Sequence, residues 1–319
     1  MDILSIDIGG TKTAAARFAW EGEVLRQVCE RASVAKNESF SNPRQAIEWA
    51  VHHCMGGKPA PDAIVLGVAG PVTQGAVRMT NLGWTIHSDG VSEALGGAHA
   101  LVCNDFELVA MSLPALAEAD LECLYEPVEP RSPGLALVVG AGTGLGHAWS
   151  LQDGTVIASE AGHADLADIS ALPVSVLNRL HELGGRLTAE TALSGSGLAN
   201  IHAALAGLAH ALAATEVVAL ALDGDAHATS AVNVFCEVLG SHIGNLCLAA
   251  PGLRGVYLTG GVIGGLRPYL GGDRFSRAMH AKPPMEALLR RIPFFHIRRE
   301  YPALLGGARL AVDRFASRG

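Results

Sequence analysis

The chain of 319 residues is poor in several residue types, and each shortage excludes a class of protein. Only 17% of its residues are charged, whereas 49% are hydrophobic, which excludes an extended disordered protein. It has no long lysine or arginine block and carries a formal net charge of −8, so we expect no nucleic-acid partner. It also lacks an uninterrupted apolar run long enough to cross a membrane, so we expect no membrane partner.

The six cysteines are dispersed, and no two of them form a C-x-x-C pair. This excludes a redox motif or a paired-cysteine zinc site, and it favours small buried residues in a reducing compartment. The first residues include the acids Asp2 and Asp7 but no basic segment, so we expect no signal peptide. The location that these features favour is the cytoplasm.

Glycine is plentiful, and two glycine-rich turns lie inside similar strand–turn–strand patterns. Alternating residues over 2–8 lead to Gly9-Gly10 and a second strand, which predicts a β-hairpin. The pattern returns over 135–151, around the turn Gly140 to Gly146. The chain is long enough for two domains, and two such halves facing one another would form a cleft.

Further elements follow from periodicity and from breakers of regular structure. Apolar spacing predicts a helix over 43–54 and an amphipathic C-terminal helix over 303–315 that packs on the N-terminal domain. Buried strands are predicted at 63–68, 100–103 and 256–258. The alternation of strands and helices indicates an α/β protein.

The first turn, Asp7-Ile8-Gly9-Gly10-Thr11-Lys12, suits an anion. Glycines let backbone N–H groups approach a phosphate closely, Thr11 adds a hydroxyl donor, and Asp7 could hold a metal ion through water. An ordinary hairpin turn is the alternative interpretation.

The second turn, Gly140-Ala141-Gly142-Thr143-Gly144-Leu145-Gly146, does not fit the dinucleotide pattern G-x-G-x-x-G in either frame. A strand follows it, where a Rossmann crossover needs a helix. A second phosphate-binding hairpin is therefore favoured over a nicotinamide site.

Asn104-Asp105 ends a buried strand just before a helix. Ligands of open α/β sheets bind at that end of the strands, where a carboxylate could accept the proton of an attacking hydroxyl. Asp105 could equally be the N-cap of the helix.

Glu160, His163 and Glu190 form a set of charged and polar groups suited to a ring of hydroxyls. A zinc site is the alternative for Glu160-x-x-His163, but the only candidate for a further ligand nearby is Asp165. Asn81 and Trp84 are weaker candidates, because a loop with a packed tryptophan explains them as well. The pair Gly260-Gly261 ends a strand and would let an adenine ring lie against backbone.

In their order, these motifs resemble the bacterial glucokinase family within the hexokinase–actin–sugar kinase superfamily. The resemblance covers nearly the whole chain through a set of six motifs and two short glycine-containing ones: Asp7-x-Gly9-Gly10-Thr11, Met79-Thr80-Asn81-x-x-Trp84, Asn104-Asp105-Phe106, the 140–146 turn, Glu160-x-Gly162-His163-x-Asp165, Glu190-x-x-Leu193-Ser194-Gly195-x-Gly197-Leu198, Gly260-Gly261-Val262 and Leu304-Leu305-Gly306.

The resemblance implies a two-domain ribonuclease-H-like fold of the actin/hexokinase type, with domains at 1–105 plus 303–319 and at 106–302 and an active-site cleft between them. It implies ATP-dependent glucose phosphorylation with Asp105 as general base, Mg²⁺ near Asp7, and a homodimer. The residues it assigns to substrate are Asn81, Asn104, Asp105, Glu160, His163 and Glu190, and those it assigns to nucleotide are Asp7, Gly9, Gly10, Thr11, Lys12, Gly142, Thr143, Gly144, Gly260 and Gly261.

The chain departs from the family pattern in two features, and three alternative functions remain. Lys12-Thr13 stands where many members have Asn-Ala, and the stretch 164–200 lacks the cysteines of the zinc-binding repressor, open reading frame and kinase (ROK) relatives. The rivals are a kinase of another hexose such as mannose, fructose or an amino sugar, a sugar-binding regulator without catalysis, and a nicotinamide-dependent enzyme.

Overall fold

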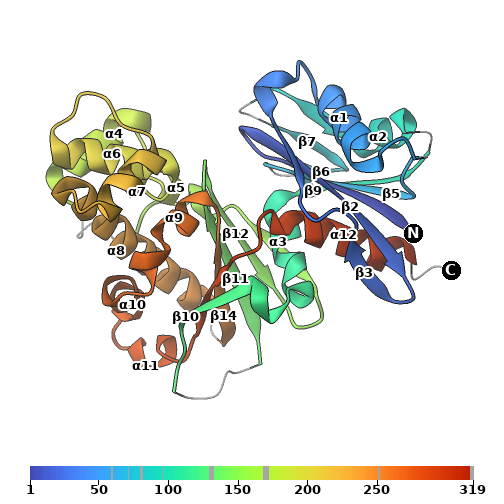
Figure 1. Ribbon diagram of the computed structural model, residues 1–319. Helices are drawn as coiled ribbons and strands as arrows, with labels where there is room; N and C mark the ends of the chain where they lie inside the picture. Colours follow the sequence, from blue (N-terminus) through green and yellow to red (C-terminus); the bar gives the residue numbers. More distant parts are fainter. Residues whose placement is uncertain are drawn as a thin grey trace. The chain divides into compact units, whose positions relative to one another are not determined.

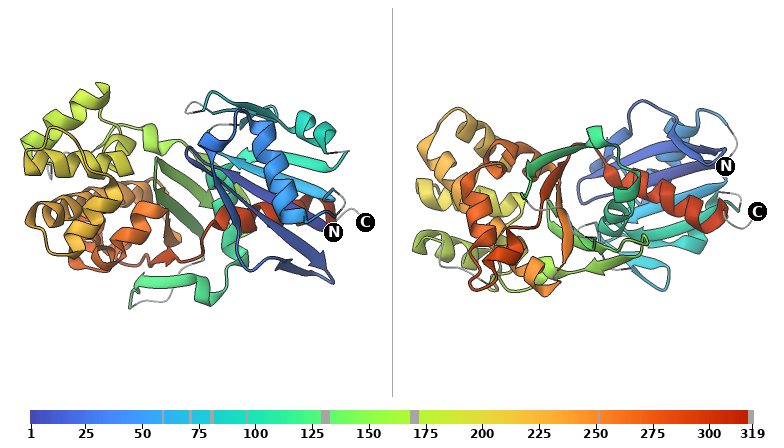
Figure 2. Two further views of the ribbon diagram at one scale, coloured as in Figure 1. Left: turned by 45° about the horizontal axis from the view of Figure 1, so that its top comes forward. Right: turned by 90° about the horizontal axis from the view of Figure 1, so that it is seen from below.

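The computed structural model describes residues 1–58, 60–70, 72–79, 82–95, 97–128, 133–167, 172–250 and 252–316. Its contacts divide the chain into two compact units (Figures 1 and 2). Unit 1 comprises Met1–Ala117, Gly154–Ala158 and Arg299–Gly319, and unit 2 comprises Glu118–Asp153 and Ser159–Arg298.

Unit 1 is built on a sheet in which the hairpin β1 (Asp2–Ile8)–β2 (Lys12–Glu21) continues into two parallel strands, β5 (Ala63–Val68) and β9 (His99–Asn104). Strands β3 (Val24–Gln27) and β4 (Ser33–Lys36) pair with β2. The expected hairpin and both strands are therefore confirmed, although in β9 only Val102 is buried.

Successive side chains of β1 point to opposite faces of this sheet, and helices cover both faces. Leu4, Ile6 and Ile8 point into a core that contains Ile47 of α1 (Pro43–Met55) and Val91 of α2 (Ser88–Ala94). On the other face, Gly307 of α12 (Pro302–Phe315) approaches Ser5. A small sheet of β6 (Val72–Thr73), β7 (Ala76–Arg78) and β8 (Thr85–His87) covers the α1–α2 side of the core.

Helix α3 (Asp105–Ser112) belongs to unit 1, whereas the sequence placed residues from 106 onward in the second domain. The reason is its packing on α12: a Cβ on Gly306 would lie 1.7 Å from the carbonyl oxygen of Leu108, so the two helices touch at their backbones. The short turn Leu113–Ala115 follows α3 and contains Pro114, a residue that cannot continue the hydrogen bonding of an α-helix.

Unit 2 repeats the strand plan of unit 1. The hairpin β11 (Leu135–Ala141)–β12 (Leu145–Ser150) continues into the parallel strands β14 (Leu253–Thr259) and β15 (Phe294–Ile297). One edge strand of this sheet is β10 (Leu121–Tyr125), and the other is β13 (Val156–Ser159), of which residues 156–158 belong to unit 1 by their contacts. Both sheets thus place an antiparallel hairpin beside two parallel strands, which confirms the expected ribonuclease-H-like fold.

Most helices of unit 2 gather beside its sheet (Figure 1), and apolar side chains of α8 belong to the same core cluster as Leu137 and Val139 of β11. They are α4 (Val174–Gly184), α5 (Ala189–Ala192), α6 (Gly195–Ala206), α7 (Ala214–Leu222), α8 (Ala226–Ala249), α9 (Gly261–Leu270), α10 (Asp273–His280) and α11 (Glu286–Leu289). Within the described part of the chain, α8 alone is long and apolar enough to cross a membrane, but 67% of its most apolar window is buried. It is therefore the core helix of unit 2.

The core of unit 2 contains a pair of histidines. His147 of β12 and His242 of α8 lie with their Nε2 atoms 3.0 Å apart, and both are buried. Burial lowers the pKa of His147 to about 3, with a further lowering from His242, and burial lowers that of His242 to about 4, with a further lowering from Lys282. Both rings are therefore neutral in the folded protein at neutral pH.

This pair predicts a loss of stability in acid. Below pH 6.5 these histidines bind protons in the unfolded chain, whereas in the folded protein they bind protons only near pH 4 and pH 3. The free energy of unfolding therefore decreases as the pH is lowered. Each histidine should lower the free energy of unfolding by about 2 kcal/mol as the pH falls from 6.5 to 5. We expect the double variant His147→Gln, His242→Gln to lose less stability than wild type over this range in denaturant unfolding. Equal losses in both proteins would contradict the assignment.

Candidate functional site

The first glycine turn is held from inside by Asn37, a residue that the sequence analysis missed. Asn37 is buried, its side chain donates to the carbonyl oxygen of Gly9 at 2.8 Å, and it accepts from the Thr13 hydroxyl at 2.7 Å. Within the turn, the Gly9 N–H donates to the Lys12 carbonyl oxygen at 2.9 Å. The departure at Thr13 therefore has a structural reason, because its hydroxyl helps to fix the turn. Thr11 and Lys12 are exposed.

In unit 1 the negative charge of Asp105 affects the titration of Asp7. The pKa of Asp7, at the end of β1, is raised to about 7, first by burial and then by the negative charge of Asp105. Tyr301 lies in the same electrostatic neighbourhood: its pKa is raised by burial and by the charges of Glu300 and Asp7. Its backbone has a left-handed φ of 51° where α12 begins. No local pattern in the sequence indicates a functional role for this tyrosine.

The cap of α3 is Asn104, and the interpretation of Asp105 as the N-cap was wrong. The Asn104 side-chain oxygen accepts from the N–H groups of Phe106 and Glu107 at 2.8 and 3.2 Å, and its amide nitrogen donates to the Gly70 carbonyl oxygen at 3.1 Å. Asp105 is the first residue of α3, and one of its oxygens accepts from the Phe106 N–H at 2.9 Å. Asn104 therefore caps the helix, and the neighbouring carboxylate of Asp105 is half-exposed.

The second glycine turn is fixed by the segment that carries Glu190. The Leu145 N–H donates to Oε2 of Glu190 at 2.9 Å, and the Gly195 N–H donates to the Gly142 carbonyl oxygen at 2.7 Å. Inside the turn, the Gly142 N–H donates to the Gly144 carbonyl oxygen at 2.9 Å. Glu190 therefore contacts the predicted phosphate turn directly, a contact that its expected role as a sugar ligand did not include.

The Glu160–His163 motif lies against the same turn. A Cβ on Gly162 would be 2.2 Å from the Leu145 carbonyl oxygen, which explains why this position is glycine. His163 Nε2 and Glu160 Oε2 are 3.9 Å apart, and both side chains are exposed. The motif thus presents two polar side chains to solvent next to the turn.

Gly260 meets the turn from another side. It has a φ of +100°, and a Cβ there would lie 2.4 Å from the Ala141 carbonyl oxygen. Gly261 begins α9, and a Cβ on it would meet nothing within 4 Å. The structure therefore brings Gly142, Gly144, Gly162, Glu190 and Gly260 together around one hairpin turn of unit 2.

Other candidates fall outside these groupings. Asn81 lies outside the described residues, and Trp84 packs against the core of unit 1. In the part of the chain that the structure describes, no three His, Cys, Asp or Glu residues converge as metal ligands. Asp165, the nearest candidate for a further ligand, forms an ion pair with Arg186.

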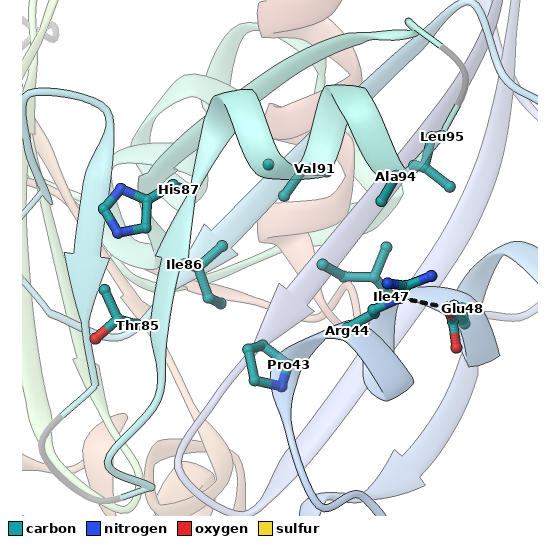
Figure 3. Close-up of a pocket in the computed structure, with 11 residues that line it drawn as sticks. Pro43, Arg44, Ile47, Glu48, Thr85, Ile86, His87, Val91, Ala94 and Leu95 are labelled. Carbon is teal, nitrogen blue, oxygen red and sulfur yellow. Dashed lines mark hydrogen bonds and ion pairs between the residues drawn. The ribbon is translucent and has the colours of Figure 1, made fainter.

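A cavity of about 250 Å³ lies in unit 1 between α1, β8 and α2 (Figure 3). Its walls are mostly apolar, with Ile47 facing Ile86 and Val91, and the ion pair Arg44–Glu48 lies at its edge. None of the residues predicted to bind substrate or nucleotide lines it.

Known glucokinase sequences are similar to this chain over almost its whole length. The Glucokinase family model matches residues 4–314. A glucokinase of Caulobacter vibrioides is 31% identical, with 95% of this chain and 92% of the relative covered. A glucokinase of Chromobacterium violaceum is 33% identical, with 98% and 90% covered.

Solved structures agree. The crystal structure of a glucokinase from an Antarctic psychrotroph has a TM-score of 0.79 and 28% identity, and the match covers 98% of this chain and 99% of that one. A ROK family glucokinase from Streptomyces griseus, in complex with glucose and AMPPNP, shares the fold at a TM-score of 0.68 and 18% identity, covering 98% and 100% of the two chains. Sequence and fold together place this chain in the glucokinase family.

Proposed function

We propose that this protein transfers the γ-phosphoryl group of ATP to the 6-hydroxyl of D-glucose, with Asp105 as the general base. The observation that carries the proposal is the position of Asp105 at the carboxyl end of β9. There Asn104 caps α3, and the Asp105 carboxylate does not have to serve as the cap. A carboxylate held at that edge of a sheet can accept the hydroxyl proton as the oxygen attacks phosphorus.

The other predicted site residues would bind the sugar and the nucleotide. Glu160, His163 and Glu190 would accept and donate hydrogen bonds to sugar hydroxyls, together with Asn104 and Asn81. The turns at 9–12 and 142–144 would hold the nucleotide phosphates through backbone N–H groups, and Gly260-Gly261 would border the adenosine. Both turns are fixed by hydrogen bonds to neighbouring segments, so their donors are oriented before a nucleotide binds.

The residues around Asp7 fit Mg²⁺. The charge of Asp105 is close enough to raise the pKa of Asp7, and carboxylate oxygens are the donors that a hard divalent cation prefers. When bound, Mg²⁺ would neutralise charge on the phosphates. Asp7 would hold it through water, and Asp105 would remain the group that receives the proton.

Two finer assignments, ATP as the phosphoryl donor and a homodimer as the assembly, rest on the family resemblance. The cytoplasm as the location rests on the dispersed cysteines. Solved structures of glucokinases in complex with glucose, or with glucose and AMPPNP, support a sugar and a nucleotide as the two small-molecule ligands.

The proposal is tested by measuring ADP formation from Mg·ATP across glucose, mannose, fructose and glucosamine. We expect the highest kcat/KM on glucose. A higher value on another hexose would keep the kinase and overturn glucose as the substrate. Nucleotide binding without turnover on any sugar would overturn the enzyme and favour a sugar-binding regulator.

A further inference from the structure

The phosphate turn and the sugar motif of unit 2 meet at one residue, Leu145. Its N–H donates to Glu190 Oε2 at 2.9 Å, and its carbonyl oxygen is so close to Gly162 that a Cβ there would be 2.2 Å away. Both backbone groups of Leu145 therefore contact segments that carry predicted sugar ligands. Leu145 itself is buried, and its hydrogen bond to Glu190 is partly buried.

The sugar segments are also tied to one another. The Ala189 N–H donates to the Ala164 carbonyl oxygen at 2.9 Å, and Asp165 and Thr188 form a β-bridge. Thr188 caps α5 by accepting from the Thr191 N–H at 3.2 Å, which fixes the helix that carries Glu190. A closed circuit of contacts thus runs from Leu145 through Glu190 and Ala164 to Gly162 and back to Leu145.

The Glu190 carboxylate can accept hydrogen bonds from the Leu145 N–H and from a sugar hydroxyl at the same time. A carboxylate has about four lone-pair positions, and the Leu145 N–H occupies one of them at Oε2. A sugar hydroxyl that donates to the same carboxylate would hold it in the rotamer that fixes the turn. Hydrogen bonds to a charged acceptor are the stronger kind, so each contact favours the orientation that the other needs.

We infer that Glu190 is a positioning residue for the phosphate turn, and that through Leu145 it couples sugar binding to the conformation of that turn within unit 2. The inference rests on the proposed function, since it takes Glu190 as a sugar ligand. Because coupling between two sites is reciprocal, a change made in the turn should alter sugar affinity even when no nucleotide is present.

Two alanine substitutions in unit 2 provide this test. A Cβ on Gly144 would lie 2.6 Å from Glu190 Oε2 and would displace the carboxylate. The control is Gly264, an exposed glycine of α9 outside the predicted binding residues, where a Cβ would meet only His296 Nε2 at 4.0 Å. Neither glycine has a φ in the left-handed region, so alanine is free of that strain at both positions.

The measurement is glucose binding by titration calorimetry without nucleotide. We expect Gly144→Ala to weaken glucose binding by about 5- to 150-fold, the usual range of coupling, and Gly264→Ala to match wild type. Equal glucose affinity in wild type and Gly144→Ala would overturn the coupling while leaving the proposed function intact. A wild-type protein that binds no glucose would instead overturn the proposed function.

A second variant guards against a failure of Gly144→Ala to fold. Glu190→Gln keeps the side-chain shape but removes the charge that the Leu145 N–H meets. We expect it to weaken AMPPNP binding several-fold in the absence of sugar, although Glu190 is not among the predicted nucleotide ligands. Unchanged AMPPNP affinity would contradict the inference.

Discussion

The variant Asp105→Asn is expected to lose about 10²- to 10⁴-fold in kcat, the usual contribution of a general base. The amide has the same shape as the carboxylate but cannot accept the proton of the sugar hydroxyl. Because Asn104 rather than Asp105 caps α3, the substitution leaves the cap in place, and thermal unfolding should match wild type closely. The measurement is steady-state ADP formation at saturating glucose and Mg·ATP.

A matched control lies two residues further along α3. Glu107 is also a partly buried carboxylate in the first turn of that helix, but it is not among the predicted site residues. Glu107→Gln should therefore keep most of its turnover. Wild-type kcat in Asp105→Asn, or an equal loss in both variants, would show that Asp105 is not the base.

The largest expected effect on stability belongs to Gly306→Ala. The new methyl carbon would lie 1.7 Å from the carbonyl oxygen of Leu108 and 3.1 Å from the amide nitrogen of Ser112, both backbone atoms of α3. Since neither atom can rotate away, α12 and α3 must separate. We expect a loss of about 3 kcal/mol or more in the free energy of unfolding, at the upper end of overpacking costs. Denaturant unfolding measures it.

The control for this prediction is Gly90→Ala in α2. That glycine is exposed inside a helix, and a Cβ on it would meet nothing within 4 Å. Alanine should raise stability there by about 0.5–1 kcal/mol, because glycine is the poorer helix former. The same substitution is thus expected to act in opposite directions at the two helices. A stable Gly306→Ala protein would mean that α3 and α12 are not in backbone contact.

The sequence predicted the local elements that carry the site, because their signals are local. The hairpin around Gly9-Gly10, the strand that ends at Asn104 and the turn at 140–146 follow from alternation and from glycine spacing. The motif order also predicted the family, which the family model and the relatives confirm.

Long-range partners could not be predicted from the sequence. Asn37 reaches the first turn from a separate segment, and only the pairing of β2 with β4 brings it there. The assignment of α3 to unit 1 depends on a backbone contact between residues 108 and 306, which no local pattern reports. The contact between Glu190 and Leu145 is likewise tertiary. The substrate and nucleotide roles of the predicted residues stay predictions.

The most direct test of the central claim compares glucose with 6-deoxyglucose, which lacks the acceptor hydroxyl. With wild-type protein and Mg·ATP, we predict that ADP forms in step with glucose 6-phosphate, and that 6-deoxyglucose yields no ADP above the rate without sugar. Equal ADP formation with both sugars, or none with either, would contradict phosphoryl transfer to the 6-hydroxyl.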